Sequence, residues 1–127
     1  MNDVLEGRLL LRQQRFHYYL SYLEDELLWE LIERVSGLYP AIQKVYLYGS
    51  KARGDFTEES DIDLLFVTGH QFSRREKFAL YDMIFELEVK YEVSVSAIFV
   101  SLKDFIERKS LFLREIDKEK VLLWSRG

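Results

Sequence analysis

The sequence has no cysteine, a single proline and only two histidines among its 127 residues. Without cysteine, neither a disulfide framework nor a thiolate metal site is available, and no cysteine pattern supports secretion. No apolar run approaches the roughly 18 residues that a membrane-spanning helix needs. The short leucine run at residues 9–11 lies between arginines and does not resemble a signal peptide. We therefore expect a soluble, cytoplasmic protein without membrane contact.

The charged residues give little support for a nucleic-acid partner. The formal net charge is −4, and lysine and arginine form no extended basic segment. Binding to a phosphate backbone normally needs a basic footprint, so a nucleic-acid partner is not expected. With 48% hydrophobic and 15% aromatic residues, the chain has enough apolar side chains for one core but hardly for two. We interpret residues 1–127 as a single domain.

The first segment, residues 1–40, is rich in helix-forming residues. The absence of proline between residue 2 and about residue 37 predicts one long helix or two consecutive helices. Ser21 followed by Glu24 fits a capping box, which marks a point where a helix restarts. Beyond it, we expect an apolar stripe at helical spacing to cover a sheet: Leu23, Leu27, Leu28, Leu31 and Val35.

The second segment, residues 41–102, alternates between strand and helix patterns. The β-branched and aromatic runs at 44–48, 62–67 and 93–100 are typical of strands. Before the last run, Ser73 and Glu76 form another capping box, and the helix it opens has apolar residues at a 3.6-residue period: Phe78, Tyr81, Ile84, Phe85 and Val89.

A further short helix is expected to start at residues 101–104. In the third segment, residues 103–127, the apolar residues between Leu111 and Trp124 are too irregularly spaced to distinguish helix from strand. Together with the alternation before it, this order predicts an α/β (α+β) fold. We expect a small mixed sheet flanked by helices and preceded by the long helical N-terminal segment.

The pair Asp61 and Asp63 stands at the start of the second predicted strand. Because side chains alternate along a strand, both carboxylates point to the same face. Alone, the pair also fits a polar strand end, but two carboxylates on one face repel each other unless a cation relieves the conflict. Mg²⁺ prefers such oxygen ligands, so the pair predicts a site for two Mg²⁺ ions.

Gly49 and Ser50 stand where the first predicted strand ends. Glycine there lets the backbone approach a ligand, and backbone N–H groups with the Ser50 hydroxyl are suited to cradle a phosphate. We interpret Arg53 either as a phosphate contact or as an ion-pair partner that ties down the loop, with three candidate acids: Asp55, Glu58 and Glu59. Lys51 is interpreted as a solvated charge.

Gly-Ser-x-Ala-Arg-Gly at residues 49–54 and Ser-Asp-x-Asp-Leu at residues 60–64 together resemble the signature of the DNA polymerase beta-like nucleotidyltransferase superfamily. The similarity is strongest to its small stand-alone members, the minimal nucleotidyltransferases. The resemblance covers residues 44–67 well and continues more weakly to about residue 102. It implies that ATP phosphates are held by Gly49, Ser50 and Arg53, and that Mg²⁺ is bound by Asp61 and Asp63.

A third carboxylate is harder to place. The family normally carries one on a later strand, where it completes the metal site and often acts as general base. In this sequence Ser94 and Ser96 occupy the corresponding stretch. Glu92 shares their face by strand alternation, so it is the candidate third catalytic acid. If Glu92 does not act as the third acid, we expect the protein to bind nucleotide and metal but to turn over slowly or not at all.

The resemblance implies an enzyme that transfers AMP from ATP to a hydroxyl acceptor and releases pyrophosphate. Minimal nucleotidyltransferases often act as antitoxins beside a small helical HEPN-type ribonuclease toxin, so such a toxin is the implied partner and acceptor. A homo-oligomer also remains open. The alternative hypothesis is a catalytically degenerate module that binds nucleotide, or masks a toxin by contact alone.

Overall fold

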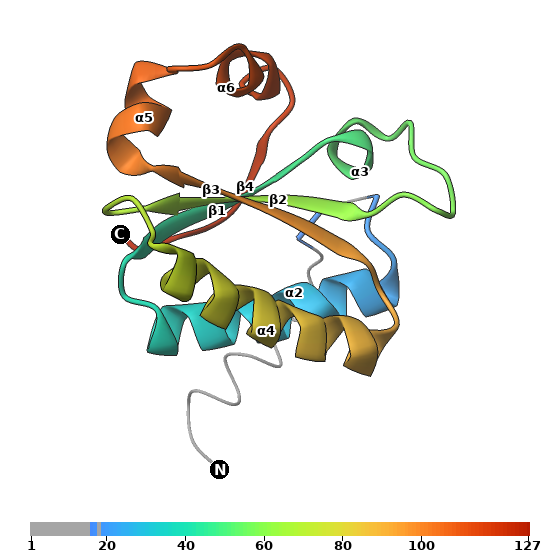
Figure 1. Cartoon of the computed structure of the whole chain (residues 1–127). Helices are drawn as coiled ribbons and strands as arrows, with labels where there is room; N and C mark the ends of the chain where they lie inside the picture. Colours follow the sequence, from blue (N-terminus) through green and yellow to red (C-terminus); the bar gives the residue numbers. More distant parts are fainter. Residues whose placement is uncertain (1–15, 18) are drawn as a thin grey trace.

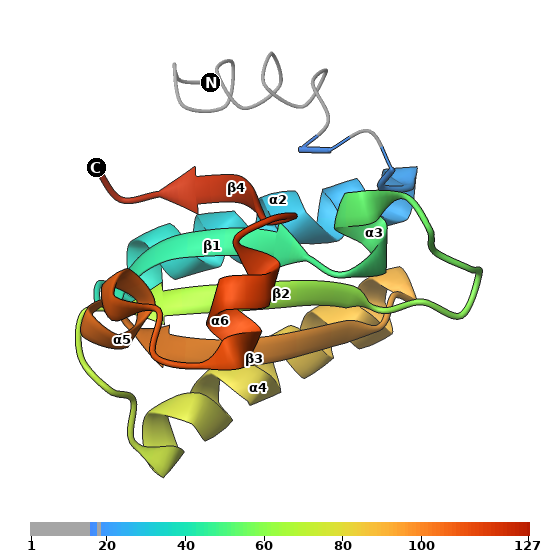
Figure 2. The same cartoon turned by 90° about the horizontal axis from the view of Figure 1, so that it is seen from above.

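The computed structural model describes residues 16–17 and 19–127, which form a four-stranded sheet with helices on both faces (Figure 1). In chain order the elements are α2 (Tyr22–Leu38), β1 (Ile42–Tyr48), α3 (Ser50–Arg53), β2 (Ile62–Thr68), α4 (Arg74–Tyr91), β3 (Val95–Ser101), α5 (Leu102–Glu107), α6 (Leu111–Ile116) and β4 (Val121–Ser125). Helices α2 and α4 cover one face of the sheet, and α5 and α6 cover the other (Figures 1 and 2). The predicted α/β class with a small mixed sheet is confirmed.

Helix α2 begins at the predicted restart point. The Ser21 hydroxyl accepts a hydrogen bond from the Glu24 N–H at 3.2 Å, and the Glu24 carboxylate accepts one from the Ser21 N–H at 2.7 Å. Most of the predicted stripe is buried, whereas Leu23 is exposed. The earlier part of the expected N-terminal helix, at residues 1–15 and 18, lies outside the described residues.

Helix α4 also begins with its predicted capping box, formed by Ser73 and Glu76. Of the five apolar positions that mark its helical period, only Ile84 is buried. Four of those side chains are exposed: Phe78, Tyr81, Phe85 and Val89. The residues that pack into the core are Leu80, Met83, Ile84 and Leu87. Both sets have helical spacing, and the period alone does not tell which of two apolar stripes faces a sheet.

Strand β1 lies between β2 and β4 in the sheet. It pairs antiparallel with β2, with Tyr48 opposite Asp63, and antiparallel with β4, with Leu47 opposite Val121. Strand β2 pairs parallel with β3, with Asp63 beside Ser96. The end of β1 therefore meets the beginnings of β2 and β4 at one edge of the sheet.

The two faces of the sheet carry separate apolar clusters. Leu64 packs in the larger cluster beneath α2 and α4, whereas Leu65 packs in the smaller one with Leu113 and other residues of the α6 face. Because strand side chains alternate, Asp63 points to the same face as Leu65. The predicted carboxylate therefore lies on the face covered by α5 and α6.

The C-terminal segment forms α6 and β4, which the irregular spacing of its apolar residues left undecided. Leu113 and Ile116 of α6 are buried against Tyr46 and Tyr48 of β1. Strand β4 then extends the sheet beyond β1. Within the described part of the chain, no helix has the length and apolar character to cross a membrane.

Candidate active site

Gly49 forms a turn between β1 and α3 that brings the backbone against Asp63. Its φ of 77° lies in a region that favours glycine. A Cβ atom added at Gly49 would lie 2.2 Å from Asp63 Oδ2, which is a severe overlap. Glycine is therefore needed at this position both for the turn and for the close approach of the Asp63 carboxylate.

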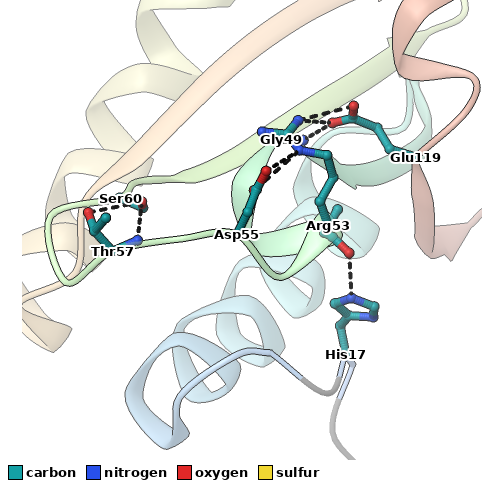
Figure 3. A network of polar contacts seen from close by, with 8 residues as sticks. His17, Gly49, Arg53, Asp55, Thr57, Ser60 and Glu119 are labelled. Atoms are coloured by element: carbon teal, nitrogen blue, oxygen red, sulfur yellow. Dashed lines mark hydrogen bonds and ion pairs between the residues drawn. The ribbon is translucent and has the colours of Figure 1, made fainter.

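Helix α3 is short, and buried groups hold it on the rest of the fold. The Lys51 ammonium pairs with the Glu24 carboxylate at 3.0 Å, and both side chains are nearly excluded from solvent. The ammonium also lies 4.1 Å from the centroid of the Phe56 ring. His17 Nε2 lies 3.1 Å from the Ala52 carbonyl oxygen (Figure 3). The interpretation of Lys51 as a solvated charge was wrong, because its ammonium docks α3 onto the start of α2.

Replacing Lys51 with methionine is expected to destabilise the fold by about 2 kcal/mol, because the buried Glu24 carboxylate loses its cation. Methionine keeps most of the apolar stem, so the loss of packing is small. Denaturant unfolding measures the difference, with Lys103→Met on exposed α5 as the control. Equal stabilities of the two variants would show that the ion pair does not hold α3.

Asp63 is half-buried on β2, and Asp61 is exposed just before that strand. Burial raises the pKa of Asp63 above its ordinary value, the charge of Asp61 raises it further, and Arg53 partly offsets both. Within the described residues, no side-chain hydrogen bond or ion pair compensates either carboxylate. The two charges therefore disfavour each other, which a nearby cation relieves.

This donor set fits a hard divalent cation such as Mg²⁺. Carboxylate oxygens are suitable ligands, and Mg²⁺ is commonly held by one or two carboxylates together with water and substrate phosphates. Residues 16–17 and 19–127 contain no group of three or more His, Cys, Asp or Glu side chains arranged to hold a metal. Asp61 and Asp63 would thus supply part of a coordination shell that water and nucleotide phosphates complete.

The strand argument for Glu92 fails, because Glu92 does not lie on a strand. It is the C-cap of α4 with a φ of 55°, and β3 begins only at Val95. The β3 residue beside Asp63 is Ser96, which has no carboxylate. Glu92 instead lines a surface hollow together with Lys51 and other residues. Because α4 extends to Tyr91, Glu92 is not part of β3, so strand alternation does not place its side chain on the same face as Ser94 and Ser96.

A carboxylate that the sequence reasoning missed reaches the site from the turn just before β4. Since Leu47 lies opposite Val121, continuing the antiparallel register brings Glu119 opposite Gly49. Glu119 Oε2 accepts the Gly49 N–H at 2.5 Å and an Arg53 Nη1 hydrogen bond at 2.9 Å (Figure 3). To identify Glu119 from the sequence, one would have to predict both strand β4 and its pairing with β1.

Arg53 is engaged by two carboxylates in this structure. Its Nε donates to both oxygens of Asp55, at 3.1 and 3.2 Å, and its Nη1 donates to Glu119. The ion-pair interpretation of Arg53 is therefore confirmed for Asp55, with Glu119 as an unexpected second partner. The side chain remains 46% exposed, so a phosphate has access to it. Ser50, at the start of α3, is also partly exposed.

Comparison with known proteins shows the family to which this chain belongs. The family of nucleotidyltransferase domains matches residues 28–123. A curated protein of Methanocaldococcus jannaschii, named as a candidate protein adenylyltransferase, is 35% identical over 95 residues, which is 74% of this chain and 83% of that protein. A second protein of the same organism, with the same description, is 35% identical over 57 residues, 45% of this chain and 58% of that protein. The chain belongs to the nucleotidyltransferase domain family, as its motif predicted.

Solved structures share the fold. A candidate nucleotidyltransferase from Sulfolobus solfataricus superposes with a TM-score of 0.56 at 23% identity, over 99% of this chain and 90% of that one. A toxin–antitoxin structure with AMP-PNP gives a TM-score of 0.56 at 19% identity, over 77% of this chain and 73% of that one. Both matches extend well beyond the motif, so the predicted fold holds for most of the chain.

Proposed function

We propose that this nucleotidyltransferase is an Mg²⁺-dependent adenylyltransferase that moves AMP from ATP to a hydroxyl group of an acceptor protein. The acceptor oxygen forms a bond to the α-phosphorus, the α–β phosphoanhydride bond breaks, the hydroxyl proton is lost, and pyrophosphate leaves. The observation that carries the proposal is the convergence of the Gly49 turn and the Asp63 carboxylate at the edge where β1 ends and β2 begins.

In this proposal the phosphates lie at Gly49, Ser50 and Arg53, and the metal ions lie at Asp61 and Asp63. When bound, the ions would reduce repulsion on the phosphates and activate the attacking oxygen. The closeness of Asp63 to the Gly49 turn supports this assignment. A phosphate at the turn is then adjacent to a cation at the carboxylates, which is the arrangement that nucleotidyl transfer requires.

The description of both Methanocaldococcus relatives as candidate protein adenylyltransferases supports a protein as acceptor. A HEPN-type toxin is the acceptor that the motif resemblance implies. The shared fold of the toxin–antitoxin structure with AMP-PNP is in keeping with that partner and with ATP as the nucleotide. We therefore propose an antitoxin that silences its toxin by adenylylation.

Incubation with α-labelled ATP and Mg²⁺ tests this function. The purified protein is combined with a HEPN-type protein encoded beside it, and label on protein and released pyrophosphate are both measured. We expect label on the toxin, in step with pyrophosphate release, and its loss when EDTA removes the metal. Label on the nucleotidyltransferase alone would reject the toxin as acceptor but not the transfer chemistry.

A contact-only module is the second candidate, because Ser96 leaves β3 without a carboxylate beside Asp63. Such a module would bind ATP, leave every acceptor unlabelled, and still neutralise the toxin when Asp63 is replaced. An enzymatic antitoxin loses neutralisation in that variant. Toxin activity measured with the Asp63→Asn protein therefore separates the two candidates.

A further inference from the structure

Glu119 places a carboxylate on two groups that the proposed function assigns to nucleotide phosphates. Its Oε2 accepts the Gly49 N–H at 2.5 Å, and Arg53 Nη1 donates to its two oxygens at 3.1 and 2.9 Å (Figure 3). Guanidinium and backbone N–H groups bind carboxylate and phosphate oxygens in the same manner. The two donors that we assign to a phosphate are thus already hydrogen-bonded to the Glu119 carboxylate.

The Glu119 carboxylate is not fully buried and is held by a cation on one side. The side chain is 19% exposed, and Arg53 is its partner in an ion pair. Its carboxylate also lies near that of Asp63, because both carboxylates lie against the Gly49 turn. Glu119 therefore stays at the site through its hydrogen bonds, against repulsion from Asp63.

Exchange would need only a rotation of the side chain. The backbone around Glu119 is held by hydrogen bonds from the N–H groups of Glu119 and Lys120 to the Ile116 carbonyl oxygen, at 3.0 and 2.8 Å. The neighbouring β4 is paired with β1. The three side-chain torsions of glutamate remain available to turn the carboxylate away while the backbone stays in place.

We propose that Glu119 sets the nucleotide affinity of the site by competing with the triphosphate for Gly49 and Arg53. This inference rests on the proposed function. Without nucleotide, Glu119 holds Arg53 beside the Gly49 turn. With nucleotide, the phosphates take both donors and the Glu119 carboxylate turns away. Removal of its charge therefore strengthens binding of ligands that carry phosphate and leaves binding of adenosine unchanged.

The variant Glu119→Gln tests this competition, since it keeps the size of the side chain and an oxygen that accepts the Gly49 N–H. Charge-assisted hydrogen bonds are roughly twice as strong as neutral ones, so the dissociation constant for ATP is expected to fall about five- to thirtyfold. Isothermal titration without acceptor measures it, with pyrophosphate and adenosine as further ligands. Pyrophosphate binding is expected to tighten, and adenosine binding is not.

Glu115→Gln is the matched control, because Glu115 is an exposed residue of α6, pairs with Lys118 and carries the same charge. An equal increase in ATP affinity in both variants would mean that net charge alone causes the effect, and it would overturn the inference. An unchanged or weakened ATP affinity of Glu119→Gln would also overturn the inference. The proposed function would still stand in that case, provided that the wild type binds ATP. Failure of every form to bind ATP or pyrophosphate would overturn both.

Discussion

Asp63→Asn is expected to lower the rate of AMP transfer about 10³-fold or more. Asparagine keeps the shape of the side chain but loses the charge that holds the proposed metal ions beside the Gly49 turn. Metal stabilisation of transition-state charge contributes several kcal/mol, and each 1.4 kcal/mol is a factor of ten in rate. Label transfer from α-labelled ATP to the acceptor measures the loss at saturating nucleotide.

The same variant is expected to unfold at an equal or higher temperature than the wild type. Burial and the charge of Asp61 raise the pKa of Asp63 in the folded state, so its ionisation opposes folding at neutral pH. Asparagine removes that cost. The advantage is expected to shrink as the pH falls through the raised pKa and to vanish below the pKa of the unfolded chain, where aspartate is protonated in both states. Thermal melts at neutral and acidic pH measure this trend.

Asp82→Asn on the exposed face of α4 is the control for both measurements, since it removes the same charge far from the motif in the sequence. It should change neither transfer nor the pH dependence of melting. Full activity in Asp63→Asn would contradict the metal assignment, whereas loss of activity together with unfolding would mean that Asp63 serves the fold.

The motif could be predicted from the sequence because its residues are local and their constraints are strict. Gly49 needs a positive φ and has no room for a side chain, and Asp63 follows the alternation of a buried strand. The capping boxes at Ser21 and Ser73 are equally local and were also predicted correctly. The roles of these site residues in binding remain predictions.

The features that could not be predicted from the sequence depend on contacts between residues that are far apart in the chain. Glu119 reaches Gly49 across 70 residues only because β4 pairs with β1, and the pattern of the tail did not predict a strand. Lys51 is buried because Glu24, 27 residues earlier, lies against it. The exposed stripe of α4 that includes Phe85 has the same period as the buried one. In each case the deciding partner is distant in sequence, where neither period nor propensity carries information.

Gly49→Ala is expected to destabilise the fold by about 2–5 kcal/mol and to slow transfer about 100-fold or more. An alanine at a φ of 77° costs about 1–2 kcal/mol, and the overlap with Asp63 adds about 1–3 kcal/mol. Relief of the overlap moves the Asp63 carboxylate, and a displacement of about 1 Å at a reacting centre costs roughly 100-fold in rate. Gly37→Ala is the control, because the methyl group added at this position of α2 would point into open space. Helix propensity predicts that it stabilises by up to about 1 kcal/mol.

A double-mutant cycle with Asp63→Ala separates the two causes of the Gly49→Ala effect. Asp63→Ala removes Oδ2 and Cγ, the atoms 2.2 and 3.0 Å from the added Cβ, and leaves the strained φ unchanged. Gly49→Ala should therefore cost about 1–3 kcal/mol less in the Asp63→Ala background, as measured by denaturant unfolding. Strictly additive free energies would mean that backbone strain alone excludes alanine. A large coupling would mean that Gly49 is needed because the carboxylate lies against the turn, the same contact that joins the proposed phosphate and metal sites.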